Sequence, residues 1–231
     1  MSKKNKKLRP FWFKYIKAFL KLIIKKPEFK YLGEEIKDGS ILLSNHVGAF
    51  GPLSLELYLN MRFRFWGTYE MNSNLISVYK YLANIYFYEK KHWNLTLSRL
   101  FCLIAAPVLW FFYRGLNLIP TYTDHRLKNT MCESIKVLQN KDSIVIFPED
   151  STDGYHDVIS KFYPGFSLLA KKLYAKGIDT PIYVGYLKKK ERLYIVDKAI
   201  KYSELVSMGL SPQQQADYLC DRVNYLGKLS F

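Results

Sequence analysis

Short apolar runs and longer segments of helical periodicity alternate along this chain of 231 residues. Residues 40–44 (SILLS) and 143–147 (SIVIF) are apolar runs of strand length bounded by polar turns, a pattern typical of buried β-strands. Further strands are expected at residues 61–68, 116–119, 181–186 and 193–196.

Between these runs, apolar side chains recur every three to four residues, as on the buried face of an α-helix. Leu127, Met131 and Ile135 mark one such face, while Ser211 and Pro212 suit the N-cap and first turn of a C-terminal helix. The other helices are expected after Pro52 and over residues 75–88 and 165–176. Because strands and helices alternate without an internal repeat or a linker, residues 31–231 are predicted to form a single layered α/β domain.

Residues 1–30 follow a different pattern, with lysines on one arc of a helix and aromatic and aliphatic residues on the other. Pro27 is expected to end this basic amphipathic helix. Such a helix lies in a membrane interface, packs on its own domain with a solvated lysine face, or binds nucleic acid. We predict the membrane, with these residues in contact with lipid: Trp12, Phe13, Lys14, Lys17, Phe19 and Lys21.

Residues 100–113 (LFCLIAAPVLWFFY) form a second apolar segment, uncharged and bracketed by Arg99 and Arg114. The run is shorter than the ~20 residues that a membrane-spanning helix needs, and it contains Pro107. It is expected to be a buried core helix or a hairpin in the membrane interface.

Charge strengthens the membrane interpretation. The chain carries 35 Lys and Arg against 20 Asp and Glu, a net charge of +15, and residues 1–30 alone hold eleven basic residues and one acidic residue. With 49% apolar residues the protein is not a disordered basic tail, and no nucleic-acid-binding motif accompanies the lysines, so no nucleic acid partner is expected. The three cysteines lack CxxC spacing, which favours a reduced, cytosolic environment.

Candidate chemistry lies in the two turns that directly follow the strongest strands. The first turn contains Asn45 and His46, and the second contains Glu149. In parallel sheets, functional groups gather beyond the carboxyl ends of strands, so a catalytic His46 is favoured over a simple turn histidine. The remaining acidic residues of the second turn, with His156, lack the alternating ligands of a calcium loop, and a solvated loop is expected rather than a metal site.

Four short segments in a fixed order resemble the motifs of the glycerolipid acyltransferases of the 1-acylglycerol-3-phosphate acyltransferase type. They are Asn45-His46 with Pro52, residues 115–122 (GLNLIPTY), Phe147-Pro148-Glu149, and residues 181–184 (PIYV). The resemblance covers about residues 35–200, and four motifs in order are a fairly specific signal.

The resemblance implies a mixed, largely parallel sheet flanked by helices. It also implies transfer of an acyl group from acyl-CoA or acyl carrier protein to a hydroxyl of a lysophospholipid or glycerol phosphate, without a cofactor or metal. His46 would act as general base beside Asn45, and the following residues would bind the acceptor: Pro148, Glu149, Arg114, Arg126 and Lys128. The expected location is the cytoplasmic face of a membrane, as a peripheral or monotopic protein.

Two positions depart from the family pattern. Gly51 stands where the family has the Asp that orients the histidine, and Asp150-Ser151-Thr152 replaces Gly-Thr-Arg. A carboxylate from elsewhere, with Glu149, Asp150, Asp153 and Glu56 as candidates, would restore the orienting group, or a backbone carbonyl would take its place. The alternative function is a catalytically weak or inactive relative that binds lipid or membrane.

Overall fold

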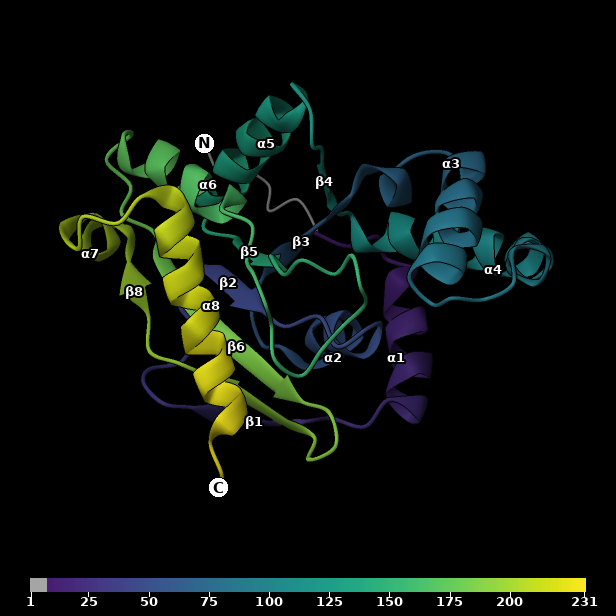
Figure 1. Ribbon diagram of the computed structural model, residues 1–231, viewed down its shortest axis with the longest axis horizontal. Helices are drawn as coiled ribbons and strands as arrows, with labels where there is room; N and C mark the ends of the chain where they lie inside the picture. Colours follow the sequence, from purple (N-terminus) through teal and green to yellow (C-terminus); the bar gives the residue numbers. More distant parts are fainter. Residues whose placement is uncertain (1–7) are drawn as a thin grey trace.

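The computed structural model describes residues 8–231, whose strands form one mixed sheet. Its order is β1-β7-β6-β2-β5-β3-β4, with the short β8 paired to β6. The strands are β1 (Glu28–Tyr31), β2 (Ile41–Ser44), β3 (Phe63–Thr68), β4 (Ile119–Thr121), β5 (Ser143–Ile146), β6 (Pro181–Lys188), β7 (Leu193–Val196) and β8 (Ile200–Lys201). The predicted α/β class with a mixed, largely parallel sheet is confirmed (Figure 1).

The centre of the sheet is parallel. β2 pairs in parallel with β5 and β6, β5 pairs with β3, and β3 pairs with β4. Only the edge reverses, because β7 and β8 run antiparallel to β6 and β1 follows β7. The carboxyl ends of the parallel strands therefore share one edge, which is where functional groups gather in such sheets.

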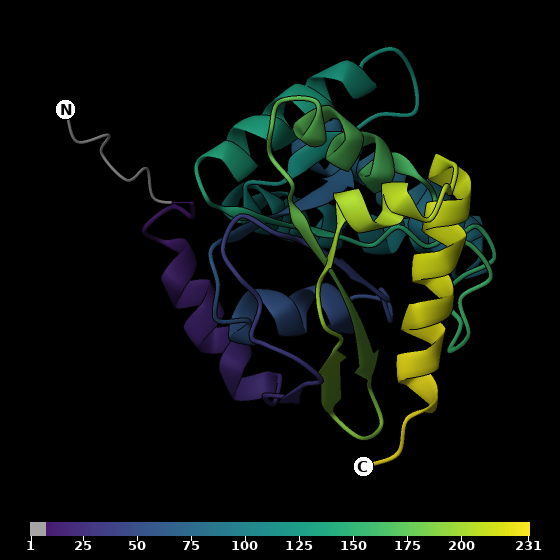
Figure 2. The ribbon, with the colours of Figure 1, turned by 90° about the vertical axis from the view of Figure 1, so that its left-hand side faces the viewer.

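Helices cover both faces of this sheet (Figures 1 and 2). One core cluster joins the sheet to α5, α6 and α8, and a second joins its other face to α1 and α2. A third cluster forms within α3, η2 and α4, beside the β3–β4 end of the sheet. The helices are α1 (Phe13–Ile23), α2 (Phe50–Tyr58), α3 (Leu75–Lys80), α4 (Leu95–Leu116), α5 (Leu127–Gln139), α6 (Gly165–Tyr174), α7 (Tyr202–Ser207) and α8 (Pro212–Lys228), with the 3₁₀ turn η1 (Tyr69–Asn72) and the π-helical segment η2 (Tyr81–Glu89).

Alternation along the strands explains why the apolar runs are continuous. In β2, Ile41 and Leu43 pack in the first core cluster, whereas Leu42 between them packs in the second. The central strands β2 and β5 are buried at every position. A parallel strand covered on both faces needs apolar side chains at successive positions, which is the pattern that identified residues 40–44 and 143–147.

The apolar segment at residues 100–113 is neither a buried helix nor a hairpin. It forms the middle of α4, a continuous helix of 22 residues that contains Pro107 and that is long and apolar enough to cross a membrane. Only 17% of its most apolar stretch is buried. The expectation was wrong because the helix continues past Arg99 and Arg114, which bracket the uncharged run, and little of that run is buried.

The strand expected at residues 116–119 begins later, at Ile119, because α4 continues to Leu116. Asn117 ends the helix in a left-handed conformation, with φ of 49°. Asparagine tolerates this conformation better than most residues, so it suits a helix end here.

Helix α1 confirms the helical periodicity near the N-terminus but packs differently from the prediction. Residues 1–7 of the predicted segment lie outside the described residues. Phe13 is fully buried against Gly115 of α4, so it contacts protein rather than lipid. Lys17 does not belong to a solvated lysine face, because its Nζ lies 3.2 Å from Oε1 of the buried Glu56. The helix also ends at Ile23, before Pro27.

Candidate functional site

The two turns singled out in the sequence meet at the carboxyl edge of the sheet. β2 and β5 are parallel neighbours, with Leu43 opposite Ile146, so His46 and Glu149 emerge side by side. Oε1 of Glu149 accepts a hydrogen bond of 2.9 Å from the backbone N–H of His46. Residues 103 positions apart in the chain therefore form one site.

Asn45 holds the first turn in place rather than contacting the imidazole. Its side-chain Nδ2 donates to the carbonyl oxygen of Leu187 at 3.2 Å, and its Oδ1 accepts from the Leu187 N–H at 2.7 Å. The side chain is almost fully buried and both amide groups are used by β6. Asn45 thus positions the neighbouring His46.

The imidazole of His46 lies between two aromatic rings. Tyr155 stacks on it with a centroid distance of 4.5 Å and an interplanar angle of 15°, and Phe147 lies at 4.8 Å with a tilt of 59°. Burial lowers the pKa of His46 to about 4, and the charge of Lys90 acts in the same direction, while the Gly48 backbone opposes part of the shift. The ring is therefore neutral near pH 7, as a general base must be before it accepts a proton.

No carboxylate orients this ring among the described residues. Nδ1 of His46 is buried without a hydrogen-bond partner in residues 8–231. The position where the family has Asp is blocked as well as changed. A Cβ on Gly51 would lie 2.1 Å from the His46 carbonyl oxygen and 2.9 Å from its carbonyl carbon. Real Cβ atoms essentially never approach so closely. The turn has a shape that only glycine at position 51 allows.

The backbone of the same turn is strained at Val47, where φ is 48°. A β-branched residue rarely adopts positive φ, because its branched Cβ crowds the backbone. Gly48 follows with φ of 62°, so two successive residues are left-handed between the strand and α2. Such strain persists where the surroundings fix the backbone, and it often marks functional sites.

The predicted replacement carboxylates do not hydrogen-bond to the His46 ring. Both oxygens of Glu56 are taken by Arg9 and Lys17, at 2.7 and 3.2 Å, on the side of the molecule that holds α1. Asp150 accepts hydrogen bonds from the N–H and hydroxyl of Thr152, and Asp153 is exposed. The carboxylate explanation is therefore wrong for these three candidates, and the fourth, Glu149, bonds the backbone N–H of His46 rather than Nδ1 of its ring.

Lys90 is a site residue that the sequence did not reveal. It follows the π-helical segment η2, and its Nζ donates to Oγ of Ser151 at 2.9 Å, directly after the Glu149–Asp150 pair. Burial lowers the pKa of Lys90, and the nearby carboxylates Asp150 and Glu149 raise it in part. Burial raises the pKa of Glu149 to about 7, although the His46 N–H and Lys90 favour its ionised form. Lys90 lies outside the four motifs, because it follows η2 and reaches the site from another part of the chain.

The other predicted acceptor-binding cations lie farther along the sheet or point elsewhere. Arg126 follows β4 at the same edge, where it pairs with Asp124 at 2.7 Å and stacks on the rings of Tyr69 and Tyr122. Arg114 lies before β4 begins, over the Trp110 ring. Lys128 is exposed in the first turn of α5. Pro148 belongs to the turn itself, and its carbonyl accepts from the backbone of the returning loop.

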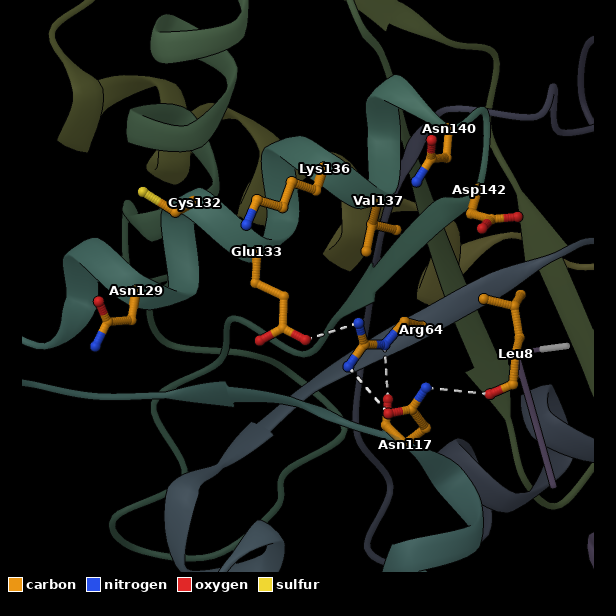
Figure 3. A pocket seen from close by; sticks show the side chains of 10 residues that line it. All are labelled: Leu8, Arg64, Asn117, Asn129, Cys132, Glu133, Lys136, Val137, Asn140 and Asp142. Atoms are coloured by element: carbon orange, nitrogen blue, oxygen red, sulfur yellow. Dashed lines mark hydrogen bonds and ion pairs between the residues drawn. The ribbon is translucent and has the colours of Figure 1, made fainter. Parts of the chain in front are cut away.

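A cavity of about 610 Å³ is lined by side chains near the amino ends of β3 and β5 and by side chains of α5 (Figure 3). The cavity is separate from His46, which lies beyond the carboxyl end of β2. Arg64 of β3 points into it and is already bound by Glu133 at 2.8 Å and by the carbonyl of Asn117 at 2.7 Å. Asn117 in turn donates to the carbonyl of Leu8 at 3.2 Å. These contacts link Leu8 to β3 and α5. The Arg64 guanidinium that points into the cavity is therefore already paired.

Metal chemistry has no obvious ligand set in the part of the chain that the structure describes. No group of three or more His, Cys, Asp and Glu side chains within residues 8–231 is arranged to hold a metal ion. The acidic residues near His156 are exposed or bound to neighbouring hydroxyl and amide groups instead.

The fold is an α/β fold with a mixed, largely parallel sheet flanked by helices. The chain is similar in structure to the crystal structure of the 1-acyl-sn-glycerophosphate (LPA) acyltransferase PlsC from Thermotoga maritima, with a TM-score of 0.53 and 13% sequence identity. The match covers 93% of this chain and 78% of PlsC. The resemblance predicted from the motifs is thereby confirmed at the level of the fold. No protein family matches the sequence, and neither does any curated protein.

Proposed function

We propose that this protein transfers an acyl group from an acyl thioester to a hydroxyl of a lysophospholipid or glycerol phosphate. The observation that carries the proposal is the pairing of a neutral His46 with Glu149 at the carboxyl edge of a sheet whose fold is shared with PlsC. Acyl-CoA and acyl carrier protein are the candidate donors, and the reaction needs no further cofactor.

In the proposed reaction, His46 takes the proton from the acceptor hydroxyl while that oxygen attacks the thioester carbonyl carbon. The C–S bond then breaks, and the departing thiolate receives the proton from the imidazolium. An alcohol is a weak nucleophile at neutral pH, so this base is what makes the attack feasible. Without a partner at Nδ1, the imidazolium lacks the stabilisation that a carboxylate gives, and we expect slow turnover.

The acceptor's anionic group is proposed to bind near Lys90. This cation is held at Ser151, and its charge acts on both His46 and Glu149. A phosphate there would form charge-assisted hydrogen bonds with the ammonium group. Arg126, two strands away at the same edge, is a second candidate contact for a longer acceptor.

The proposal is tested by incubating purified protein with lysophosphatidate and acyl-CoA or acyl carrier protein, and following thiol release. His46→Ala should abolish thiol release, because the proton acceptor is lost. His125→Ala is the matched control, since it removes an exposed histidine and should leave the rate unchanged. Thiol release from the wild type no faster than from His46→Ala, with every donor, would contradict the enzymatic proposal.

A non-catalytic lipid-binding protein is the second candidate, and the unpartnered Nδ1 together with Gly51 favours it. This candidate predicts that the wild type and His46→Ala bind lysophosphatidate with equal affinity, as measured by calorimetry, and that neither protein consumes thioester. The enzyme instead requires turnover in the same preparation.

Membrane association is proposed through the exposed apolar residues of α1 and α4. On α4, Leu100, Ile104 and Val108 lie one helical turn apart and are 60%, 78% and 65% exposed. Trp12 at the start of α1 stacks on Phe111 of α4 at 4.3 Å, so the two helices meet along this surface. Burying such side chains in lipid is favourable by about 25 cal/mol per Å².

Helix α1 exposes both apolar and positively charged side chains, which are the two kinds that an anionic membrane surface attracts. Its exposed residues include Phe19, Leu22 and Ile23 as well as Lys14 and Lys21. Aromatic and aliphatic groups enter the acyl boundary, while lysines remain at the headgroups. We therefore propose residues 1–30 as the membrane-associating segment, through α1, and residues 31–231 as the acyltransferase-like domain, at the cytoplasmic face of a membrane. Residues 28–30 of the first segment also belong to β1 and so to the sheet of the domain.

A further inference from the structure

The loop between β5 and α6 extends away from the sheet, and its two ends are hydrogen-bonded to each other. At its base Glu149 and Phe162 form an antiparallel bridge, and the Asp150 N–H donates to the Lys161 carbonyl at 3.0 Å. The Tyr163 N–H also donates to the Pro148 carbonyl at 2.8 Å. The two ends of the loop are thus fixed to each other.

The returning arm of this loop is anchored to the rest of the molecule. Asn224 of α8 accepts from the Ile159 N–H and donates to the Ile159 carbonyl, both at 2.8 Å. The hydroxyl of Tyr186 in β6 donates to the Asp157 carbonyl at 2.6 Å. Residues 157–162 therefore have a fixed position on α8 and β6.

The outgoing arm, residues 151–156, forms a flap that carries Tyr155 over His46. Gly154 turns the flap with φ of +100°, a conformation that other residues rarely adopt, and its N–H donates to the Ser151 carbonyl at 3.2 Å. Lys90 holds Ser151 from the other side. The flap is built so that the Tyr155 ring lies nearly parallel to the imidazole.

Aromatic rings cover the imidazole, the Gly48 backbone favours its protonated form, and no carboxylate of the described residues contacts it. Tyr155 covers one face and Phe147 approaches at an angle, while Nδ1 has no hydrogen-bond partner in the described chain. Gly51 leaves no space for the side chain that would supply such a partner. A flat ring in face contact restricts rotation of the imidazole about its Cβ–Cγ bond, which is what an orienting hydrogen bond otherwise does.

We propose that Tyr155 is a positioning residue that holds the His46 imidazole by stacking, in place of the carboxylate that the backbone at Gly51 excludes. The proposal rests on the proposed function in one respect, that His46 is the general base. Tyr155 acts through the flat face of its ring, and its hydroxyl takes no part in proton transfer.

The charged and titratable groups that face His46 come from two elements. Lys90 follows η2, and Glu149 and Tyr155 belong to the loop after β5. Removing the Tyr155 ring exposes the imidazole to water, so the pKa of His46 should rise from about 4 toward its ordinary value of 6.5. The charge of Lys90 remains and opposes the last part of that rise.

The test compares Tyr155→Phe, Tyr155→Leu and Tyr155→Ala in full-length protein. Histidine ¹³Cε1 resonances are titrated by NMR, with His46→Ala identifying the signal among the four histidines. Tyr155→Phe should keep the wild-type pKa, and Tyr155→Ala should raise it by more than about one unit, because burial is the main cause of the shift. Gly154→Ala, which strains the flap without touching His46, should raise the pKa in the same direction.

Thiol-release kinetics separate positioning from burial. Tyr155→Leu preserves apolar bulk but not the flat face, so kcat should fall about 10- to 100-fold with KM for the thioester nearly unchanged. Tyr155→Phe should retain kcat within about twofold, since stacking needs only the ring.

An unchanged pKa and kcat in Tyr155→Ala would overturn the proposal, as would a Tyr155→Phe variant that behaves like Tyr155→Ala. If the wild type consumes no thioester but the NMR shifts follow the expected order, Tyr155 still holds the imidazole and the proposed acyl transfer is what fails. The two failures are therefore distinguishable.

Discussion

The backbone carbonyl of His46 occupies the space in which a side chain at position 51 would begin. Residue 51 therefore determines the shape of the turn, beyond the presence or absence of one carboxylate. The strained Val47 and the left-handed Gly48 belong to the same arrangement. A single substitution back to the family residue cannot rebuild the family geometry, because the backbone has to move first.

Gly51→Asp should accordingly lower the free energy of unfolding by about 1–3 kcal/mol, as overpacking does, and should not increase thiol release. Urea denaturation and the thiol assay measure the two effects. Ala49→Asp is the control, because it adds a carboxylate at the exposed N-cap position of the same turn, where acidic residues are favourable. A faster, equally stable Gly51→Asp variant would contradict this account of the turn.

Lys90→Ala should weaken acceptor binding more than it slows chemistry. The charge of its ammonium group acts on both His46 and Glu149, and losing one charge-assisted contact costs about 1.5–3 kcal/mol. We expect KM for lysophosphatidate to rise about 10-fold or more, measured by steady-state thiol release. Lys91→Ala serves as the control, because it removes an adjacent, exposed lysine whose ammonium group lies 6.0 Å from the centroid of the Tyr155 ring. Equal effects from the two variants would argue against a specific role for Lys90.

At the scale of elements, α1 is at once part of the core and part of the exposed apolar surface. Phe13 packs on α4, and the buried Glu56 of α2 binds both Arg9 and Lys17. Deleting residues 1–30 would remove both cations that pair with Glu56, the buried Phe13 side chain and most of β1, and breaking a buried ion pair alone typically costs 3–5 kcal/mol. A deletion therefore tests stability and membrane binding together, and surface substitutions separate them.

Ile104→Glu with Val108→Glu should reduce flotation with vesicles of phosphatidylcholine and phosphatidylglycerol, because two charges would have to enter the acyl boundary. Both side chains are exposed, so the fold should be unaffected. Val206→Glu with Met208→Glu is the matched control on the opposite side of the sheet, where 45% and 47% of these side chains are exposed. Loss of flotation in both pairs, or in neither, would contradict a membrane-facing α4.

At the scale of the whole molecule, His46 and Glu149 affect stability in opposite directions as pH changes. Folding lowers the pKa of His46 from 6.5 to about 4, so its contribution is lost as pH falls from 6.5 to 4. Folding raises the pKa of Glu149 from 4.5 to about 7, so its contribution is lost as pH rises from 4.5 to 7. Between pH 4.5 and 6.5 the two slopes nearly cancel.

Substituting either His46 or Glu149 should reveal the pH dependence of stability that the remaining group causes. Relative to the wild type, His46→Ala should lose stability as pH rises from 4.5 to 6.5, and Glu149→Gln should gain it, each by up to about 1.4 kcal/mol per pH unit. Urea denaturation across this range measures both, and subtracting the wild-type curve removes the other titrating groups. Parallel curves for all three proteins would show that neither pKa is shifted.

The sequence determined the elements whose signals are local. Continuous apolar runs identified the buried strands β2 and β5, and Ser211 and Pro212 marked the start of α8, where the predicted cap forms with Gln214. The rule that functional groups gather beyond the carboxyl ends of parallel strands pointed to the two turns that contain His46 and Glu149. These features depend on neighbouring residues and on a general rule of sheet topology.

Tertiary structure decided what distant segments do to one another. Lys90 and Tyr155 reach His46 from other parts of the chain, the carbonyl of His46 closes the space at Gly51, and Glu56 binds α1 rather than the site. No local pattern encodes such contacts, since burial and electrostatic interaction depend on where the folded chain brings each group. The same holds for α4. Its apolar run is compatible with a buried or an exposed helix, and only the packing of the folded chain leaves most of it unburied.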